Sequence, residues 1–138
     1  MPTITVQLKQ KGDTSSLLSL GEHQIIIDRP VEKDGHGEGP MGGQVLLMSV
    51  AGCFASTLYA AAKARGLRIE GLEIIVKGQL SEGPPKRFES LTLEVTGGSC
   101  GDPTMFSKLL KIAEKGCIAV NTVKNGLNFE ITESYKVL

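Results

Sequence analysis

The sequence of 138 residues predicts an α+β fold with mainly antiparallel strand pairing. Short segments in which apolar and polar residues alternate recur along the chain, and this period of two is typical of half-buried strands. One long segment, residues 42–62, has no charged residue and predicts a helix that is buried on all faces. The elements follow one another as strands, long helix, hairpin, helices and strand, which fits a single domain over residues 1–138.

The N-terminal part predicts strands that lead into a long loop. Apolar residues alternate with polar ones over residues 3–10, and residues 23–28 contain three consecutive isoleucines, so both segments are predicted strands. Residues 17–20 are a weaker candidate. Residues 29–40 hold two prolines, three glycines and five charged residues, which predicts a loop. Loops of this length in compact domains often carry function.

The middle of the chain predicts a long helix followed by a hairpin. The helix runs from about residue 42 to residue 65, and Gly66 is its predicted C-terminal stop. Residues 67–80 and 87–96 are strand-like, and the Gly83-Pro84-Pro85 turn between them indicates a hairpin.

The C-terminal part predicts a glycine-rich loop at residues 97–101, then two helices and a strand. Asp102-Pro103 is a capping acid followed by proline, a favourable helix start, and Gly116 is the predicted end of that helix. A shorter helix is predicted to begin at Cys117. The alternation at residues 127–131 predicts the last strand.

The composition disfavours several classes of function. Net charge is zero, and the chain holds only two tyrosines, four phenylalanines and no tryptophan, so nothing favours nucleic-acid binding. The histidines are His23 and His36, and no Cys-x-x-Cys pair occurs, so we expect no metal site. The sequence has no P-loop, no Gly-x-Gly-x-x-Gly and no Ser-His-Asp pattern, and we expect no cofactor.

The uncharged segment 42–62 is long enough to cross a bilayer, but glycines and polar residues dilute it and strand-like segments flank it. We therefore predict a core helix and no membrane association. The N-terminus has neither a basic n-region nor an apolar h-region, which indicates no signal peptide. This predicts a cytoplasmic protein, in which cysteines are usually free thiols.

The three cysteines are the candidates for chemistry. Cys53 lies inside the apolar helix, where it either packs as a small apolar residue or reacts as a thiolate. A thiolate there would need a cation from elsewhere in the fold, because a helix dipole acts only in the end turns. Cys117 lies at a predicted helix start, where free N–H groups favour a negative sulfur; the alternative is a half-buried residue at a helix junction. Cys100 lies in the glycine-rich loop and is interpreted as a bystander.

Two segments together resemble the OsmC/Ohr family of osmotically inducible and organic-hydroperoxide-resistance proteins. The first is Leu46-Leu47-Met48-Ser49-Val50-Ala51-Gly52-Cys53, and the second is Cys117-Ile-Ala-Val-Asn121-Thr122-Val123. The second motif usually reads Cys-Pro-Val-Ser-Asn-Thr in that family, so Ile118 replaces a proline. Gly43 and Gln44 stand where the family usually has a glutamate.

The resemblance implies an OsmC-like fold in an intertwined homodimer, with long central helices wrapped by sheets from both chains. It also implies that Cys53 attacks a hydroperoxide and becomes a sulfenic acid. Cys117 then condenses with it to a disulfide, and an external dithiol reduces that disulfide. Arg29 is the candidate partner of the thiolate, and Lys33 or a cation of the second chain is the alternative.

Three functions remain open from the sequence. The first is a peroxidase for organic hydroperoxides, in which Met48, Phe54 and Leu58 line the approach of an alkyl chain; ordinary core packing explains these residues equally well. The second is a small-molecule-binding dimer that has lost activity, which the missing glutamate favours. The third, a thiol–disulfide exchange protein acting on other proteins, is disfavoured because the thiol would lie inside a helix.

Overall fold

The computed structural model describes residues 1–135, which form two compact units. The N-terminal unit comprises residues 1–49 and 76–91, and the cysteine unit comprises residues 50–75 and those from 92 onward. The helix α1 and the strands β4 and β5 contribute residues to both units. The single domain over residues 1–138 stays a prediction.

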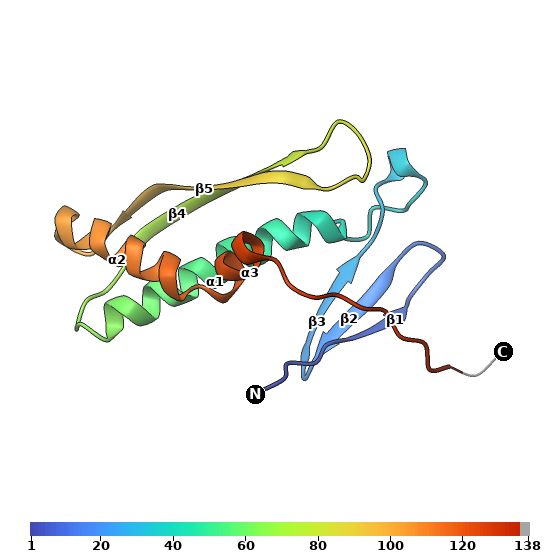
Figure 1. The fold of residues 1–138 in the computed structure, drawn as a ribbon, viewed down its shortest axis with the longest axis horizontal. Helices are drawn as coiled ribbons and strands as arrows, with labels where there is room; N and C mark the ends of the chain where they lie inside the picture. Colours follow the sequence, from blue (N-terminus) through green and yellow to red (C-terminus); the bar gives the residue numbers. More distant parts are fainter. Residues whose placement is uncertain (136–138) are drawn as a thin grey trace. The chain divides into compact units, whose positions relative to one another are not determined.

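The N-terminal unit contains an antiparallel meander of three strands, shown in blue in Figure 1. The strands are β1 (Gln7–Gln10), β2 (Ser16–Leu20) and β3 (His23–Ile27), in the order β1-β2-β3. Strand β1 begins at Gln7, later than predicted, because its pairing with β2 ends where Gln7 meets Ser19. A strand exists only where a neighbour accepts its hydrogen bonds, and alternation alone does not show where that neighbour ends.

The loop after β3 is organised by the buried carboxylate of Asp28. One oxygen accepts hydrogen bonds from the Thr14 hydroxyl (2.7 Å) and from the Arg29 backbone N–H (2.6 Å). The other accepts the backbone N–H groups of Glu38 (3.0 Å) and His36 (3.3 Å). These donors, led by the Glu38 N–H, lower the pKa of Asp28 from 3.8 to about 2. The predicted loop is therefore held in one conformation, which includes a short 3-10 helix, η1 (Val31–Lys33).

The long helix α1 (Gly42–Lys63) has a defined start and end, which agree closely with the prediction. At its start, the Gln44 side-chain oxygen accepts the Met41 backbone N–H at 2.8 Å, in the manner of a capping box. At its end, Gly66 adopts a positive φ of 68°, and the Leu67 N–H returns to the Ala62 carbonyl at 2.9 Å.

In this chain α1 is covered along one stripe only. Its buried residues, Val50, Phe54, Leu58 and Ala62, are four apart and so share one face. Leu46, Met48 and Tyr59 remain 44%, 58% and 51% exposed. Within the described residues, α1 is the helix whose length and hydropathy would suffice to cross a membrane, and 22% of the apolar window is buried. A helix from the core of a soluble protein has the same length and composition.

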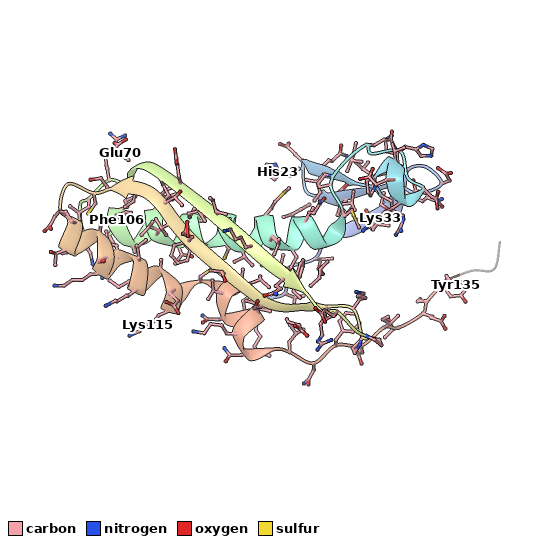
Figure 2. All side chains as sticks on the ribbon, turned by 90° about the horizontal axis from the view of Figure 1, so that it is seen from above. His23, Lys33, Glu70, Phe106, Lys115 and Tyr135 are labelled. Carbon is pink, nitrogen blue, oxygen red and sulfur yellow. The ribbon has the colours of Figure 1, made fainter. Side chains whose placement is uncertain are left out.

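The hairpin is formed by β4 (Glu70–Leu80) and β5 (Phe88–Ser99). The loop predicted from residue 97 is wrong, because β5 continues through the glycines to Ser99. Gly98 takes a φ of 144°, and a Cβ there would stand 2.8 Å from the ring of Phe106, which Figure 2 labels. The glycine therefore lets the strand pass close to an aromatic ring.

The cysteine unit is closed by α2 (Pro103–Gly116) and α3 (Ile118–Asn125). As predicted, Asp102 caps α2: its carboxylate accepts the Thr104 N–H at 3.0 Å, and Pro103 occupies the first helical position. Leu109 and Ala113 of α2 are fully buried. They share one apolar core with α1 and the helix junction, formed by Phe54, Leu58, Ala62, Leu109, Ala113 and Cys117.

The predicted strand at residues 127–131 is not present in the single chain. Leu127, Phe129 and Ile131 are 69%, 80% and 81% exposed, and the described part of the chain offers this segment no strand partner. Tyr135, labelled in Figure 2, is exposed as well. The apolar alternation is present, but alternation becomes a strand only when another strand accepts its hydrogen bonds.

Candidate active site

The sulfurs of Cys53 and Cys117 meet at the start of α3, where Figure 1 shows α2 (orange) passing into α3 (red). The Ala119 N–H donates a hydrogen bond to the Cys53 sulfur at 3.5 Å. The Val120 N–H donates to the Cys117 sulfur, also at 3.5 Å. These N–H groups belong to the first turn of a helix, which has no carbonyl of its own to offer them. One helix start therefore binds both sulfurs.

The local sequence explains why the chain breaks at this point. Gly116 is the last residue of α2, and Cys117 is extended at φ −80° and ψ 118°, so it is the cap of α3. A Cβ at Gly116 would stand 3.4 Å from the Thr57 methyl group, so the junction packs next to α1.

The two thiols differ in acidity. The pKa of Cys53 is lowered, chiefly by the Ala119 N–H and further by a hydrogen bond from the Cys117 side chain, while burial opposes the shift. The pKa of Cys117 is raised, chiefly by burial, and the neighbouring Cys53 adds to the shift. Cys117 has no exposed surface, whereas Cys53 is half-buried. Cys53 is thus the sulfur that ionises first, and Cys117 is the neutral donor beside it.

This acidity order reverses the expectation from local sequence. The helix start at Cys117 is confirmed, but the inference that it makes Cys117 the more acidic thiol is wrong, because burial outweighs the Val120 hydrogen bond. The expected cation beside Cys53 stays a prediction. The groups that lower its pKa are backbone N–H groups, led by that of Ala119, and neutral side chains. The Thr57 hydroxyl donates its hydrogen bond to the Cys53 carbonyl at 2.9 Å.

Both cysteines are free thiols in this structure, and the N–H groups of two successive residues, Ala119 and Val120, each bind one of the two sulfurs. A disulfide between two cysteines requires Cβ atoms about 3.5–4.5 Å apart. The predicted separation of the two Cα atoms, about 7 Å or less, stays a prediction. Cys100 is not part of this pair: its sulfur lies 3.5 Å from the Asp102 carbonyl, the acceptor of its thiol hydrogen bond.

The other predicted site residues lie in different surroundings. Phe54 and Leu58 belong to the apolar core, so core packing accounts for both, and their contact with substrate stays a prediction. Met48 is exposed and lines an open cavity of about 590 Å³ in the N-terminal unit, together with Ile26 and Val45. Arg29 belongs to the same unit, and its Nε donates to the Lys33 carbonyl at 3.0 Å. Its effect on the Cys53 thiolate also stays a prediction.

Sequence reasoning missed two features of the site. The Ala119 N–H is a backbone donor, and no residue type marks it; the available signal was the glycine before Cys117, which indicates a helix start. The role of Gln44 was missed as well, since its amide caps α1 at the position where a carboxylate was expected. Among residues 1–135, no group of three His, Cys, Asp or Glu side chains is placed to hold a metal ion.

Comparison with known proteins identifies the family. The OsmC family model, which describes an OsmC-like protein, matches residues 35–132. The chain belongs to the OsmC family. YmaD of Bacillus subtilis (strain 168), an uncharacterized protein, is 28% identical over 118 residues, which cover 80% of this chain and 78% of YmaD.

Solved structures of OsmC proteins share the fold. An OsmC-like protein from Mycoplasma pneumoniae matches with a TM-score of 0.73 and 21% identity, covering 91% of this chain and 89% of that protein. An organic hydroperoxide resistance protein OsmC from Legionella pneumophila, also called a predicted redox protein, matches with a TM-score of 0.63 and 20% identity. That match covers 91% of this chain and 93% of the Legionella protein. The predicted OsmC-like α+β fold is confirmed.

Proposed function

We propose that this OsmC-family chain is a cysteine-based peroxidase that reduces organic hydroperoxides. The observation that carries the proposal is the pairing of a sulfur of lowered pKa, Cys53, with the buried thiol of Cys117 at one helix start. Family membership supports a redox role, and the name of the Legionella relative supports hydroperoxides as the substrate class.

The first step is an attack of the Cys53 thiolate on the terminal oxygen of the hydroperoxide. An S–O bond forms and the O–O bond breaks, so that sulfur is oxidised and the peroxide is reduced. The alkoxide leaves and takes up a proton to become an alcohol, while Cys53 becomes a sulfenic acid. The Ala119 N–H favours this step because it stabilises the thiolate before the attack.

The second step uses Cys117. Its sulfur attacks the sulfenic sulfur of Cys53, an S–S bond forms, and the hydroxyl leaves as water with the thiol proton. The binding of the two sulfurs by successive N–H groups of one helix turn supports this step, because it brings the sulfurs near each other. An external dithiol then reduces the disulfide by thiol–disulfide exchange and is itself oxidised to a cyclic or linear disulfide.

The apolar character of the substrate rests on Met48, Phe54 and Leu58, which the proposal places along the approach of the alkyl chain. Met48 lines a cavity whose wall is mainly apolar. It is exposed, whereas Phe54 and Leu58 are buried, so Met48 is the residue of this group that a substrate can reach in the single chain.

The functional form is proposed to be a homodimer. Helix α1 is covered along one stripe of the single chain, and Leu46, Met48 and Tyr59 leave large apolar surface exposed. The apolar segment at residues 127–131 has no partner strand in the described chain. A second copy would cover both features in an obligate type of interface. Sedimentation should give a dimer at micromolar concentration, and a stable folded monomer would contradict this part of the proposal.

One observation favours a second function, a binding dimer without peroxidase activity. No carboxylate stands at Gly43 or Gln44, and the Gln44 amide is occupied with capping α1. A peroxide-consumption assay separates the two functions, with cumene hydroperoxide and hydrogen peroxide each supplied with a dithiol or a monothiol. Turnover of cumene hydroperoxide with the dithiol supports the peroxidase. If the protein consumes peroxide no faster than the reductant alone in all four combinations, the binding dimer is supported.

A further inference from the structure

Asn121 spans the junction between α2 and α3 with two hydrogen bonds. Its side-chain amide donates to the Lys115 carbonyl at 3.0 Å, and its backbone N–H donates to the Cys117 carbonyl at 2.9 Å. Lys115 lies in the last turn of α2, whose carbonyls have no partner within their own helix. The two acceptors stand on either side of Gly116, so Asn121 ties the end of one helix to the start of the next.

One other side-chain bond joins the two helices, the ion pair of Lys124 with Glu114 at 3.3 Å, and both of its side chains are more than half exposed. Gly116 has no side chain, and its backbone is intrinsically free to adopt many conformations. Ala119 and Val120 follow Cys117 directly in the first turn of α3, so the direction of their N–H groups depends on the angle at which α3 leaves the junction. A small rotation of α3 would therefore move one N–H away from the Cys53 sulfur and the other away from the Cys117 sulfur.

We propose that Asn121 is the positioning residue of the Cys53–Cys117 pair, because its side-chain amide holds the first turn of α3 against both sulfurs. Asn121 touches neither sulfur in the described hydrogen bonds and acts through the helix start. Its relevance to turnover rests on the proposed peroxidase function. Its effect on the thiols is independent of that function.

The chain offers a matched control in Asn125. Its side-chain amide donates to the Asn121 carbonyl at 2.9 Å, so it makes the same type of bond one turn later. Both partners of that bond lie within α3, and losing it leaves the junction with α2 unchanged. A difference between the two asparagines therefore reports on the junction and not on the general stability of α3.

The test measures the alkylation of Cys53 by iodoacetamide as a function of pH, with the modified peptide quantified by mass spectrometry. Iodoacetamide reacts with the thiolate, so the profile reports the ionisation of this one sulfur. For Asn121→Ala and for Asn121→Leu, which keeps a similar size and adds no charge but loses the donor, we expect the midpoint to move to higher pH. The rate at pH 7 should fall about three- to tenfold, the size expected for one misplaced hydrogen bond. Asn125→Ala should retain the parent profile.

The outcomes separate this inference from the proposed function. An unchanged profile in both Asn121 variants would overturn the positioning role, whatever the peroxide assay shows. Loss of folding in both variants, with Asn125→Ala folded by circular dichroism, would also overturn it, because Asn121 would then support the fold in general. The Asn121 variants could shift the profile while the parent chain consumes no hydroperoxide. That result would keep the positioning role and reject the peroxidase.

Discussion

The Ala119 N–H donates a hydrogen bond to the sulfur of Cys53, a residue 66 positions earlier in the chain. This bond is the main reason that the pKa of Cys53 is lowered. A sulfur in the middle of an apolar helix would otherwise be expected to have a raised pKa and little reactivity. The start of one helix thus activates a residue that another helix carries.

Removing this donor should make Cys53 less acidic. Ala119→Pro deletes the N–H in the first turn of α3, where proline is tolerated in a helix. We expect the Cys53 pKa to rise and its alkylation at pH 7 to slow about tenfold, as for the loss of a hydrogen bond to a charged group. Ala119→Gly retains the N–H and is the control. Equal profiles for the two variants would show that another group holds the thiolate.

Replacing Cys53 with serine should abolish peroxide consumption, because a hydroxyl is essentially un-ionised at neutral pH and is a far weaker nucleophile. Consumption of cumene hydroperoxide in the presence of a dithiol is the measurement. Cys100→Ser is the matched control and should consume peroxide at the parent rate, since the described hydrogen bond of the Cys100 thiol goes to the Asp102 carbonyl. Retained turnover in Cys53→Ser would reject Cys53 as the nucleophile.

Replacing Cys117 with serine should stop the cycle after its first step. One equivalent of peroxide should be consumed, and a dimedone adduct should mark a sulfenic acid at Cys53. Dithiol-dependent turnover should fall, and oxidation of Cys53 to the sulfinic acid should rise. Mass spectrometry decides which cysteine attacks the peroxide and which one resolves the sulfenic acid. A sulfenic adduct on Cys117 in the Cys53→Ser chain would show that Cys117 is the attacking residue.

Arg29 is predicted to assist the thiolate. Arg29→Ala should slow peroxide reduction at pH 7 by about tenfold, the size of a modest pKa shift caused by a nearby cation. Folding should be preserved, because the described side-chain bond of Arg29 is a single one, to the Lys33 carbonyl. Lys33→Ala is the matched comparison. Full activity in Arg29→Ala would reject Arg29, and lowered activity in Lys33→Ala would then assign the role to Lys33; full activity in both would leave a cation of the second chain or the backbone N–H groups of α3.

Asp28 should make stability depend on acid pH. Its pKa is lowered from 3.8 to about 2 by the loop N–H groups, so the folded state binds its proton less readily than the unfolded state. The stabilisation is therefore fully present above about pH 4 and is lost as pH falls toward 2. In urea titrations, Asp28→Asn should be less stable than the parent at pH 7, and the gap should narrow below pH 4. Asp13→Asn, at an exposed acid paired with His36, should show a much smaller gap.

The sequence predicts features that depend on neighbouring residues. The start of α2 follows from Asp102-Pro103, and the end of α1 follows from Gly66, because each signal acts within one turn. The acidity of the cysteines was not predictable in this way. Burial of Cys117 depends on packing against α1, and the donor to Cys53 comes from α3. The predicted strand at residues 127–131 failed for the same reason. A strand forms only beside a partner strand, and the alternation of residues does not show which segment that partner is.

The difference in exposure between the two sulfurs determines how a disulfide between them would be opened. Cys117 has no accessible surface, so an incoming thiolate would meet the Cys53 sulfur and form the mixed disulfide there. Cys117 would then be the leaving group, and its raised pKa makes it a poor one. The oxidised chain should therefore persist against monothiols, and a dithiol, whose second sulfur closes the exchange within one molecule, should be needed to release it.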